Sequence, residues 1–168
     1  MQMHFLQIYS ICIALTSVFA RKIFYSPSGG FFACSEYIVF RWVTSAHLVT
    51  LSQSSPHLQT LLAAGLHDLR DWVIVEMFQN CGHIHILDCE SWNISNTGLE
   101  ALAALGQELC EVSFKAVKEI SIEGVEMLLV GCKNICKLNV TNCPKIDQDA
   151  VAEAASELCD HYVSVSKQ

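Results

Sequence analysis

The sequence predicts an α/β fold: a short curved solenoid with parallel strands on its concave face and helices on its convex face. Apolar residues recur with a period of 26 or 25 residues between positions 55 and 158. Within each period, spacing typical of a strand gives way to spacing typical of a helix. The chain has 168 residues, of which 52% are hydrophobic and 16% charged, enough to build a substantial core. One such unit cannot bury its apolar face alone, so neighbouring units must stack.

The first half of each unit predicts a short strand. Its apolar positions follow the pattern apolar-x-x-apolar-x-x-apolar-x-apolar, and the last two point to the same side of an extended chain. Four units share these positions: Ser55, Leu58, Leu61 and Ala63; Cys81, Ile84, Leu87 and Cys89; Gly106, Leu109, Val112 and Phe114; and Cys132, Ile135, Leu138 and Val140. The strands of successive units should therefore pair in parallel.

The second half of each unit changes to helical spacing, with apolar residues three or four apart. The clearest examples are Leu99, Leu102 and Leu105; Val125, Leu128 and Cys132; and Val151, Ala154, Ala155 and Leu158. Ser95, Ser121 and Asp147 precede these segments and are expected to be their N-caps. Together the two halves make one coil of strand, loop, helix and return.

The segments outside the clear repeats divide the chain further. Gly29 and Phe32 begin a weak copy of the pattern that places its strand near Ser35, so residues 29–54 are expected to be a degenerate repeat or an N-terminal cap. Residues 55–158 hold four repeats. Cys159, Tyr162 and Val165 fit the inward positions of a partial fifth repeat or C-terminal cap over residues 159–168.

Residues 1–28 form a separate apolar N-terminal segment. Phe5 to Ala20 is an apolar run followed by Arg21 and Lys22. The apolar run resembles the hydrophobic region of a signal peptide, and the positive pair that follows it also fits a single membrane anchor. The run also fits an apolar helix packed on the end of the array. Membrane association is expected only if this run is an anchor.

The charge and the cysteines exclude several functions. The formal net charge is −7, and residues 55–168 carry seven basic against sixteen acidic side chains, which disfavours nucleic acid as a partner. None of the nine cysteines has the paired spacing of a zinc site. We expect them to be reduced, inert and mostly buried as small apolar residues, with no metal and no cofactor. His83 and His85 flank Ile84, and His85 could face outward, but no activated nucleophile lies beside them in the sequence.

The repeat resembles the cysteine-containing class of leucine-rich repeats, most clearly at 81–99 (CGHIHILDCESWNISNTGL) and 132–151 (CKNICKLNVTNCPKIDQDAV). Such repeats are typical of F-box proteins, the substrate receptors of SCF-type ubiquitin ligases, although residues 1–54 contain no recognisable F-box. The resemblance implies a non-catalytic interaction module, not an enzyme, in the cytoplasm or nucleus, with ligase subunits among its partners. The alternative is a secreted or membrane-anchored recognition protein that uses Phe5 to Ala20 to enter the secretory pathway.

A protein partner is expected on the concave face. Residues that alternate with the inward strand positions point away from the core and toward this face. Their mixture of apolar, acidic, basic and polar side chains suits a protein better than a phosphate backbone. The candidate residues are Thr60, Leu62, Ile86, Asp88, Glu90, Glu111, Ser113, Lys115, Lys137, Asn139 and Thr141.

Overall fold

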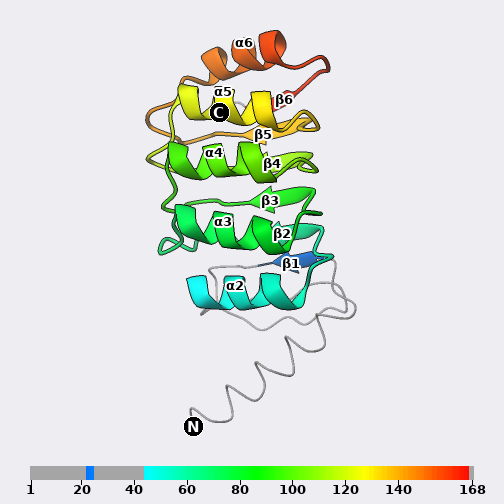
Figure 1. Ribbon diagram of the computed structural model, residues 1–168. Coiled ribbons are helices and arrows are strands. Elements are labelled where there is room, and N and C mark those ends of the chain that lie inside the picture. Colours follow the sequence, from blue (N-terminus) through cyan, green and yellow to red (C-terminus); the bar gives the residue numbers. More distant parts are fainter. Residues whose placement is uncertain (1–21, 25–43, 167–168) are drawn as a thin grey trace.

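The computed structural model describes residues 22–24 and 44–166, and these form one stack of strand–helix coils (Figure 1). Six strands pair in chain order in one parallel sheet: β1 (Lys22–Phe24), β2 (Thr60–Leu62), β3 (Ile86–Asp88), β4 (Glu111–Ser113), β5 (Lys137–Asn139) and β6 (Ser164–Ser166). Five helices alternate with them: α2 (Ser45–Ser54), α3 (Asp71–Asn80), α4 (Asn96–Leu105), α5 (Ile122–Gly131) and α6 (Gln148–Leu158).

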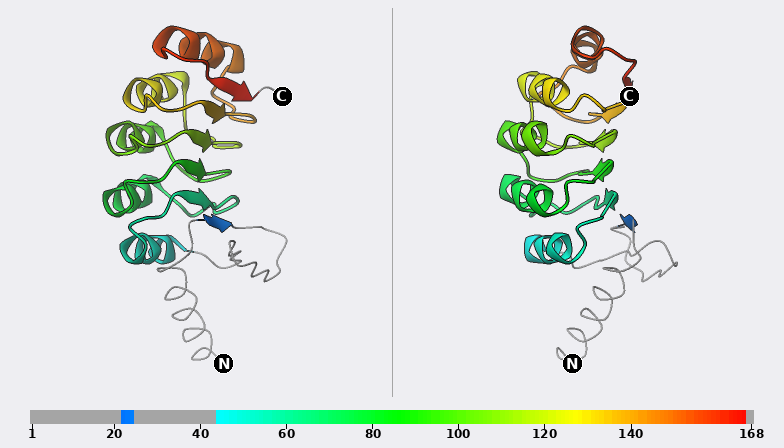
Figure 2. Two further views of the ribbon diagram at one scale, coloured as in Figure 1. Left: turned by 90° about the vertical axis from the view of Figure 1, so that its right-hand side faces the viewer. Right: turned by 45° about the vertical axis from the view of Figure 1, so that its right-hand side comes forward.

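The helices lie on one side of the stack and the strands on the other, and both columns bow toward the helix side (Figure 2). The strands therefore line the concave face and the helices the convex face, which confirms the predicted fold class. Phe5 to Ala20 and the segment around Ser35 lie outside the described residues. Within the part of the chain that is described, no helix is both long enough and apolar enough to cross a membrane.

A constant register runs through the sheet and carries the core. Leu61 pairs with Leu87, Leu87 with Val112, Val112 with Leu138, and Leu138 with Val165. The first four of these side chains are at most 3% exposed, as the two-residue alternation predicts. The next inward positions are equally buried, so each coil closes its core against the coils before and after it.

The starts of α4, α5 and α6 are where the sequence predicts them, and those of α4 and α5 are completed by the preceding repeat. Ser95, Ser121 and Asp147 are the N-cap residues of α4, α5 and α6. Asp71, the first residue of α3, accepts hydrogen bonds from the backbone N–H of Ser95 at 2.8 Å and from its hydroxyl at 2.7 Å. Asn96, the first residue of α4, accepts from the backbone N–H of Ser121 at 3.0 Å. These contacts satisfy donors that a helix start would otherwise leave unpaired.

Four turns that follow strands share one unusual backbone conformation. Gly65, Ser91, Ala116 and Asn142 occupy equivalent repeat positions and have φ of 81°, 62°, 58° and 59°. Three of these residues also donate backbone hydrogen bonds to the next coil, for example from Ser91 to the carbonyl of Lys115 at 2.8 Å. The left-handed turn therefore continues the sheet ladder beyond the three-residue strands.

The inward cysteines behave as buried apolar residues, as predicted. Cys81, Cys89 and Cys132 are 0% exposed and Cys143 is 6% exposed. Their thiols are free, and three of them donate to backbone carbonyls of the preceding repeat, as Cys143 does to Phe114 at 3.1 Å. Trp92 occupies the position equivalent to Cys143 and donates its indole N–H to the carbonyl of Ala63 at 2.7 Å. Two different side chains thus make the same bond between repeats.

The ends of the array differ from the prediction. The strand that pairs with β2 is β1, and in this register Lys22 is paired with Thr60. β1 lies earlier in the chain than the segment near Ser35, where the repeat spacing predicts a strand. At the other end, Val165 continues the inward column, but Tyr162 is 85% exposed and Val163, at 8%, takes the buried position. No further coil covers Tyr162 within the described residues, so its ring faces solvent.

Candidate functional site

The candidate site is the concave strand face, and its residues come from four consecutive coils. We call it the strand face and define it by the outward residues of β2 to β5 and of the turns that follow β3, β4 and β5. A hollow of about 260 Å³ lies on it and crosses from β2 to β6. Its lining includes Leu62, Ile86, Asp88, Glu111 and Asn139, which the sequence placed on this face.

The exposure of the predicted site residues is uneven. Lys137 is exposed, and the outward residues of β3, β4 and the following turns are half-buried. Thr60 is the exception, because it is only 5% exposed. Its prediction as an accessible contact residue is wrong, and the strand face begins at Leu62.

Ion pairs connect neighbouring coils across the strand face. The ammonium of Lys115 lies 2.9 Å from a carboxylate oxygen of Glu90, and that of Lys137 lies 2.7 Å from a carboxylate oxygen of Glu111. The hydrogen bond to each carboxylate raises the pKa of the lysine above its usual range. Both pairs lie at the surface, where they contribute little stability but keep the charges in fixed positions.

Asp88 is a half-buried acid of the strand face. Its carboxylate accepts a hydrogen bond from the backbone N–H of Glu90 at 3.0 Å and another from the hydroxyl of Ser113. Burial raises the pKa of Asp88 above its usual range, and these hydrogen bonds act in the opposite direction. Asn139 occupies the equivalent position two repeats later and accepts from the backbone N–H of Thr141 at 3.1 Å. The same local turn thus presents an acid in one coil and an amide in another.

The two histidines noted in the sequence meet a partner from the next coil. His83 Nδ1 lies 3.1 Å from a carboxylate oxygen of Glu108, and His85 Nε2 lies 3.7 Å from the same oxygen. The ring of His83 also stacks on His57 of the preceding coil, with centroids 6.2 Å apart. Sequence reasoning missed Glu108 because only the stacking of repeats brings it near. Among the described residues, no three acidic, histidine or cysteine side chains are arranged to hold a metal ion.

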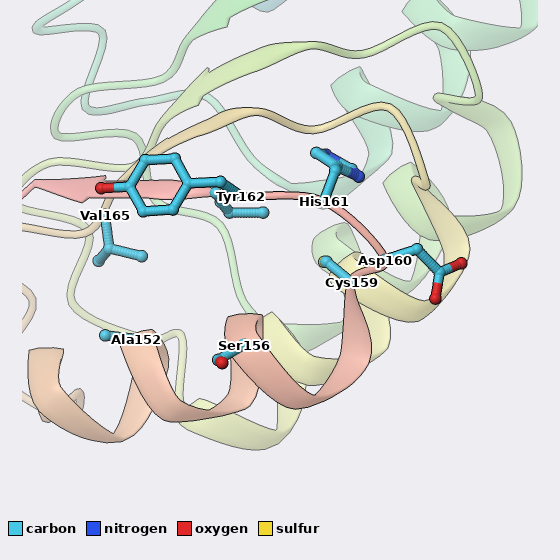
Figure 3. A pocket seen from close by; sticks show the side chains of 8 residues that line it. Ala152, Ser156, Cys159, Asp160, His161, Tyr162 and Val165 are labelled. Atoms are coloured by element: carbon cyan, nitrogen blue, oxygen red, sulfur yellow. The ribbon is translucent and has the colours of Figure 1, made fainter.

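A second hollow, of about 410 Å³, lies between α6 and the segment leading into β6. Figure 3 shows Ala152 and Ser156 on the helix pointing toward the strand side, which carries Tyr162 and Val165. Two of its polar groups have described surroundings. His161 Nε2 lies 2.7 Å from the carbonyl of Ile135, and burial raises the pKa of the neighbouring Cys159 thiol, which opposes formation of a nucleophilic thiolate.

Four inward cysteines of the described residues have the same character. Burial raises the pKa of Cys81 to about 11 and that of Cys132 to about 12, and it raises those of Cys89 and Cys143 as well. A thiol that stays protonated at neutral pH is neither a nucleophile nor a ready metal ligand. These thiols therefore pack the turns between coils.

The stacked coils, with a parallel sheet on one face and helices on the other, define an α/β repeat solenoid. No protein-family model matches the chain, and a search of curated proteins found no match. The structure is similar to a chain in the crystal structure of the Rad7 and Elc1 complex in yeast, with a TM-score of 0.61 and 16% sequence identity. The match covers 77% of this chain and 35% of that chain, so this chain spans about a third of its length. At this identity the similarity shows the fold.

Proposed function

We propose that this protein is a non-catalytic interaction module whose strand face binds a protein partner. The observation that carries the proposal is the constant register, which aligns outward side chains from successive coils on one concave surface. Fixed charge pairs such as Lys137–Glu111, apolar residues such as Ile86 and a shallow hollow give that surface the mixed character of protein interfaces. Flat, hydrogen-bonded strands hold these groups in place before a partner arrives, which lowers the entropic cost of binding.

We further propose that the module recognises substrates, or acts as a scaffold, in SCF-type ubiquitin-dependent degradation in the cytoplasm or nucleus. The support is the resemblance of the units at 81–99 and 132–151 to the repeats of F-box receptors. The fold is also similar to that of a chain in the crystal structure of the complex of Rad7 and Elc1. Ligase subunits and a substrate protein are the expected partners.

Affinity purification at native expression tests this proposal. We expect the wild-type protein to retain cullin and adaptor subunits together with a substrate protein. A variant with Asp88→Ala, Glu90→Ala and Glu111→Ala should lose the substrate protein, because these acids line the strand face. Glu76→Ala on α3 is the matched control, since it removes an acid from the opposite face. Substrate binding that survives the triple change while circular dichroism shows a folded protein would refute the strand-face assignment.

A secreted or membrane-anchored recognition protein is the second candidate, favoured by the apolar run from Phe5 to Ala20. A form with a C-terminal tag separates the two. The degradation proposal expects the tagged protein in the cytoplasm or nucleus, without glycans. Glycosylated protein in the secretory pathway would contradict the link to ubiquitin and support the second candidate, while leaving the strand face as the binding surface.

A further inference from the structure

The acidic and basic side chains are distributed unequally between helices and the rest of the fold. Helices α2 to α6 contain eight carboxylates and no lysine or arginine. The remaining residues of the described range 44–166 contain eight carboxylates and six lysine or arginine side chains. Most of the net negative charge therefore lies on the convex face, opposite the strand face.

A groove runs across this acidic surface. It spans α4, α5 and α6 and encloses about 770 Å³. Its floor is apolar: Ala103 and Ala104 of α4 lie beside Met127 and Val130 of α5, which are 39% and 52% exposed. The hollow exists because small residues on α4 and at the end of α5 alternate with these larger ones. We call this feature the convex groove.

Carboxylates border the convex groove. Glu100 of α4, Glu123 and Glu126 of α5, and Glu157 of α6 line it together with the apolar floor. The hydroxyl of Ser121 donates a hydrogen bond to Glu123 and lowers its pKa, so that this carboxylate stays ionised. None of the four forms an ion pair with a basic side chain of the described residues, whereas the acids Glu90, Glu111 and Glu119 each pair with a lysine. The groove thus offers apolar area together with four carboxylates, and Lys133 reaches its edge by donating to the carbonyl of Leu158 at 3.3 Å.

We propose that the convex groove binds a basic amphipathic helix of a partner protein. Complementary charge requires lysine or arginine on the occupant, and the apolar floor requires a stripe of apolar side chains between them. The groove walls are helices, whose backbone N–H and C=O groups are already hydrogen-bonded. An extended segment would therefore find no free backbone groups with which to pair as a strand. A helix satisfies its own backbone hydrogen bonds and can lay one face into a groove.

The dimensions and charge also exclude other occupants. Neighbouring helix axes are about 8 to 10 Å apart, so the groove across three helices is about 16 to 20 Å long, which matches a helix of about 11 to 13 residues. A second copy of this face would bring two acidic rims together. The headgroups of an anionic membrane would be repelled for the same reason. This surface lies opposite the strand face and is independent of the function proposed for it.

Fluorescence anisotropy with labelled synthetic peptides tests the proposal on the full chain. The probe is a helix of about 16 residues, or about 24 Å, with leucine and alanine on one face and lysine on the other. One control peptide has the same composition in an order without an apolar face, and a second has glutamate in place of lysine. We expect the amphipathic basic peptide to bind at least about tenfold more tightly than either control, and binding to weaken as salt screens the rim.

Matched variants locate the binding site. Glu126→Lys should weaken binding of the basic peptide by at least about tenfold, and Val130→Ser by about fivefold, since one reverses a rim charge and the other removes apolar area from the floor. Glu76→Lys makes the same change of net charge on α3, outside the groove, and should alter binding by less than about threefold. Because all three positions are exposed, the variants should keep the wild-type unfolding temperature.

Three results would overturn the proposal. The first is binding of the scrambled peptide as tight as that of the amphipathic one. The second is an equal loss of binding in Glu126→Lys and Glu76→Lys, which would show attraction by net charge alone. The third is no detectable binding of the basic peptide at concentrations up to about 1 mM. None of these results bears on the strand face.

Discussion

Replacing Gly131 with alanine should force helices α4 and α5 apart. Gly131 is the last residue of α5 and lies directly against α4. A Cβ atom added there would lie 2.6 Å from the Cβ and 2.7 Å from the Cα of Ala103, and close to its carbonyl oxygen. Carbon atoms in van der Waals contact are about 3.5 to 4.0 Å apart. Because two of the three obstructing atoms belong to the backbone, no change of rotamer can relieve the contact.

The magnitude follows from two opposing effects. Inserting a methyl group into a packed contact costs about 1 to 3 kcal/mol. Alanine recovers at most about 1 kcal/mol of helix propensity relative to glycine, and less at the end of a helix. The expected loss of unfolding free energy is therefore about 1 to 2 kcal/mol. For a chain of this size, that lowers the unfolding temperature by about 2 to 8 °C.

Urea unfolding followed by circular dichroism measures this loss. Gly82→Ala is the control, because nothing lies within 4 Å of a Cβ added at Gly82. It should change the unfolding free energy by no more than about 0.5 kcal/mol. Combining Gly131→Ala with Ala103→Gly should recover only part of the loss, since the contact with the backbone remains. A Gly131→Ala protein as stable as the wild type, or stabilised as helix propensity alone would predict, would refute the reasoning.

Three further predictions concern buried groups and a turn. Cys132→Ser should make the unfolding free energy fall less steeply between about pH 9 and pH 11, as measured by urea unfolding at each pH. In the folded state the pKa of the Cys132 thiol is about 12, whereas an unfolded thiol has a pKa of about 8.5. Between these values only the unfolded state releases the proton, so the free energy of unfolding of the wild type falls as the pH rises. The same pH dependence of the unfolding free energy in the wild type and in Cys132→Ser would contradict a raised pKa at Cys132. Trp92→Phe should cost about 1 to 3 kcal/mol in the same assay at neutral pH, because the carbonyl of Ala63 loses its indole donor, while Trp72→Phe, at a position 49% exposed, should be near neutral. Ala116→Gly should increase the free energy of unfolding by up to about 1 kcal/mol and raise the unfolding temperature slightly, because φ of 58° strains alanine but not glycine. A lower unfolding temperature would count against strain at this turn.

The inward ladder and the helix starts could be predicted because they repeat. Leu87, Val112 and Leu138 occupy one column, and a period of 25 or 26 residues makes that column visible in the sequence itself. Ser121 could be recognised as an N-cap from its place just before a helical pattern. That its backbone N–H is held by Asn96 could not be recognised, because that contact depends on how two coils stack.

The ends and the surfaces were harder to predict, for physical reasons. β1 lies 38 residues before its partner in β2, outside the repeat spacing, so periodicity gives no sign of it. Periodicity specifies which residues point inward, but it does not show which outward residues meet across coils. The contact of Glu108 with His83 and the groove beneath Glu126 depend on that stacking, and no sequence pattern marks them.

The bonds from Asp71 to Ser95 and from Asn96 to Ser121 give the array a direction. In both cases, a side chain from the earlier coil completes the start of the later helix. During synthesis the N-terminal coil leaves the ribosome first, and domains emerge at about 5 to 20 residues per second. Helices α4 and α5 can therefore each find the side chain that completes their first turn as soon as they emerge. Addition of coils from the N-terminal end is the order that these two contacts favour.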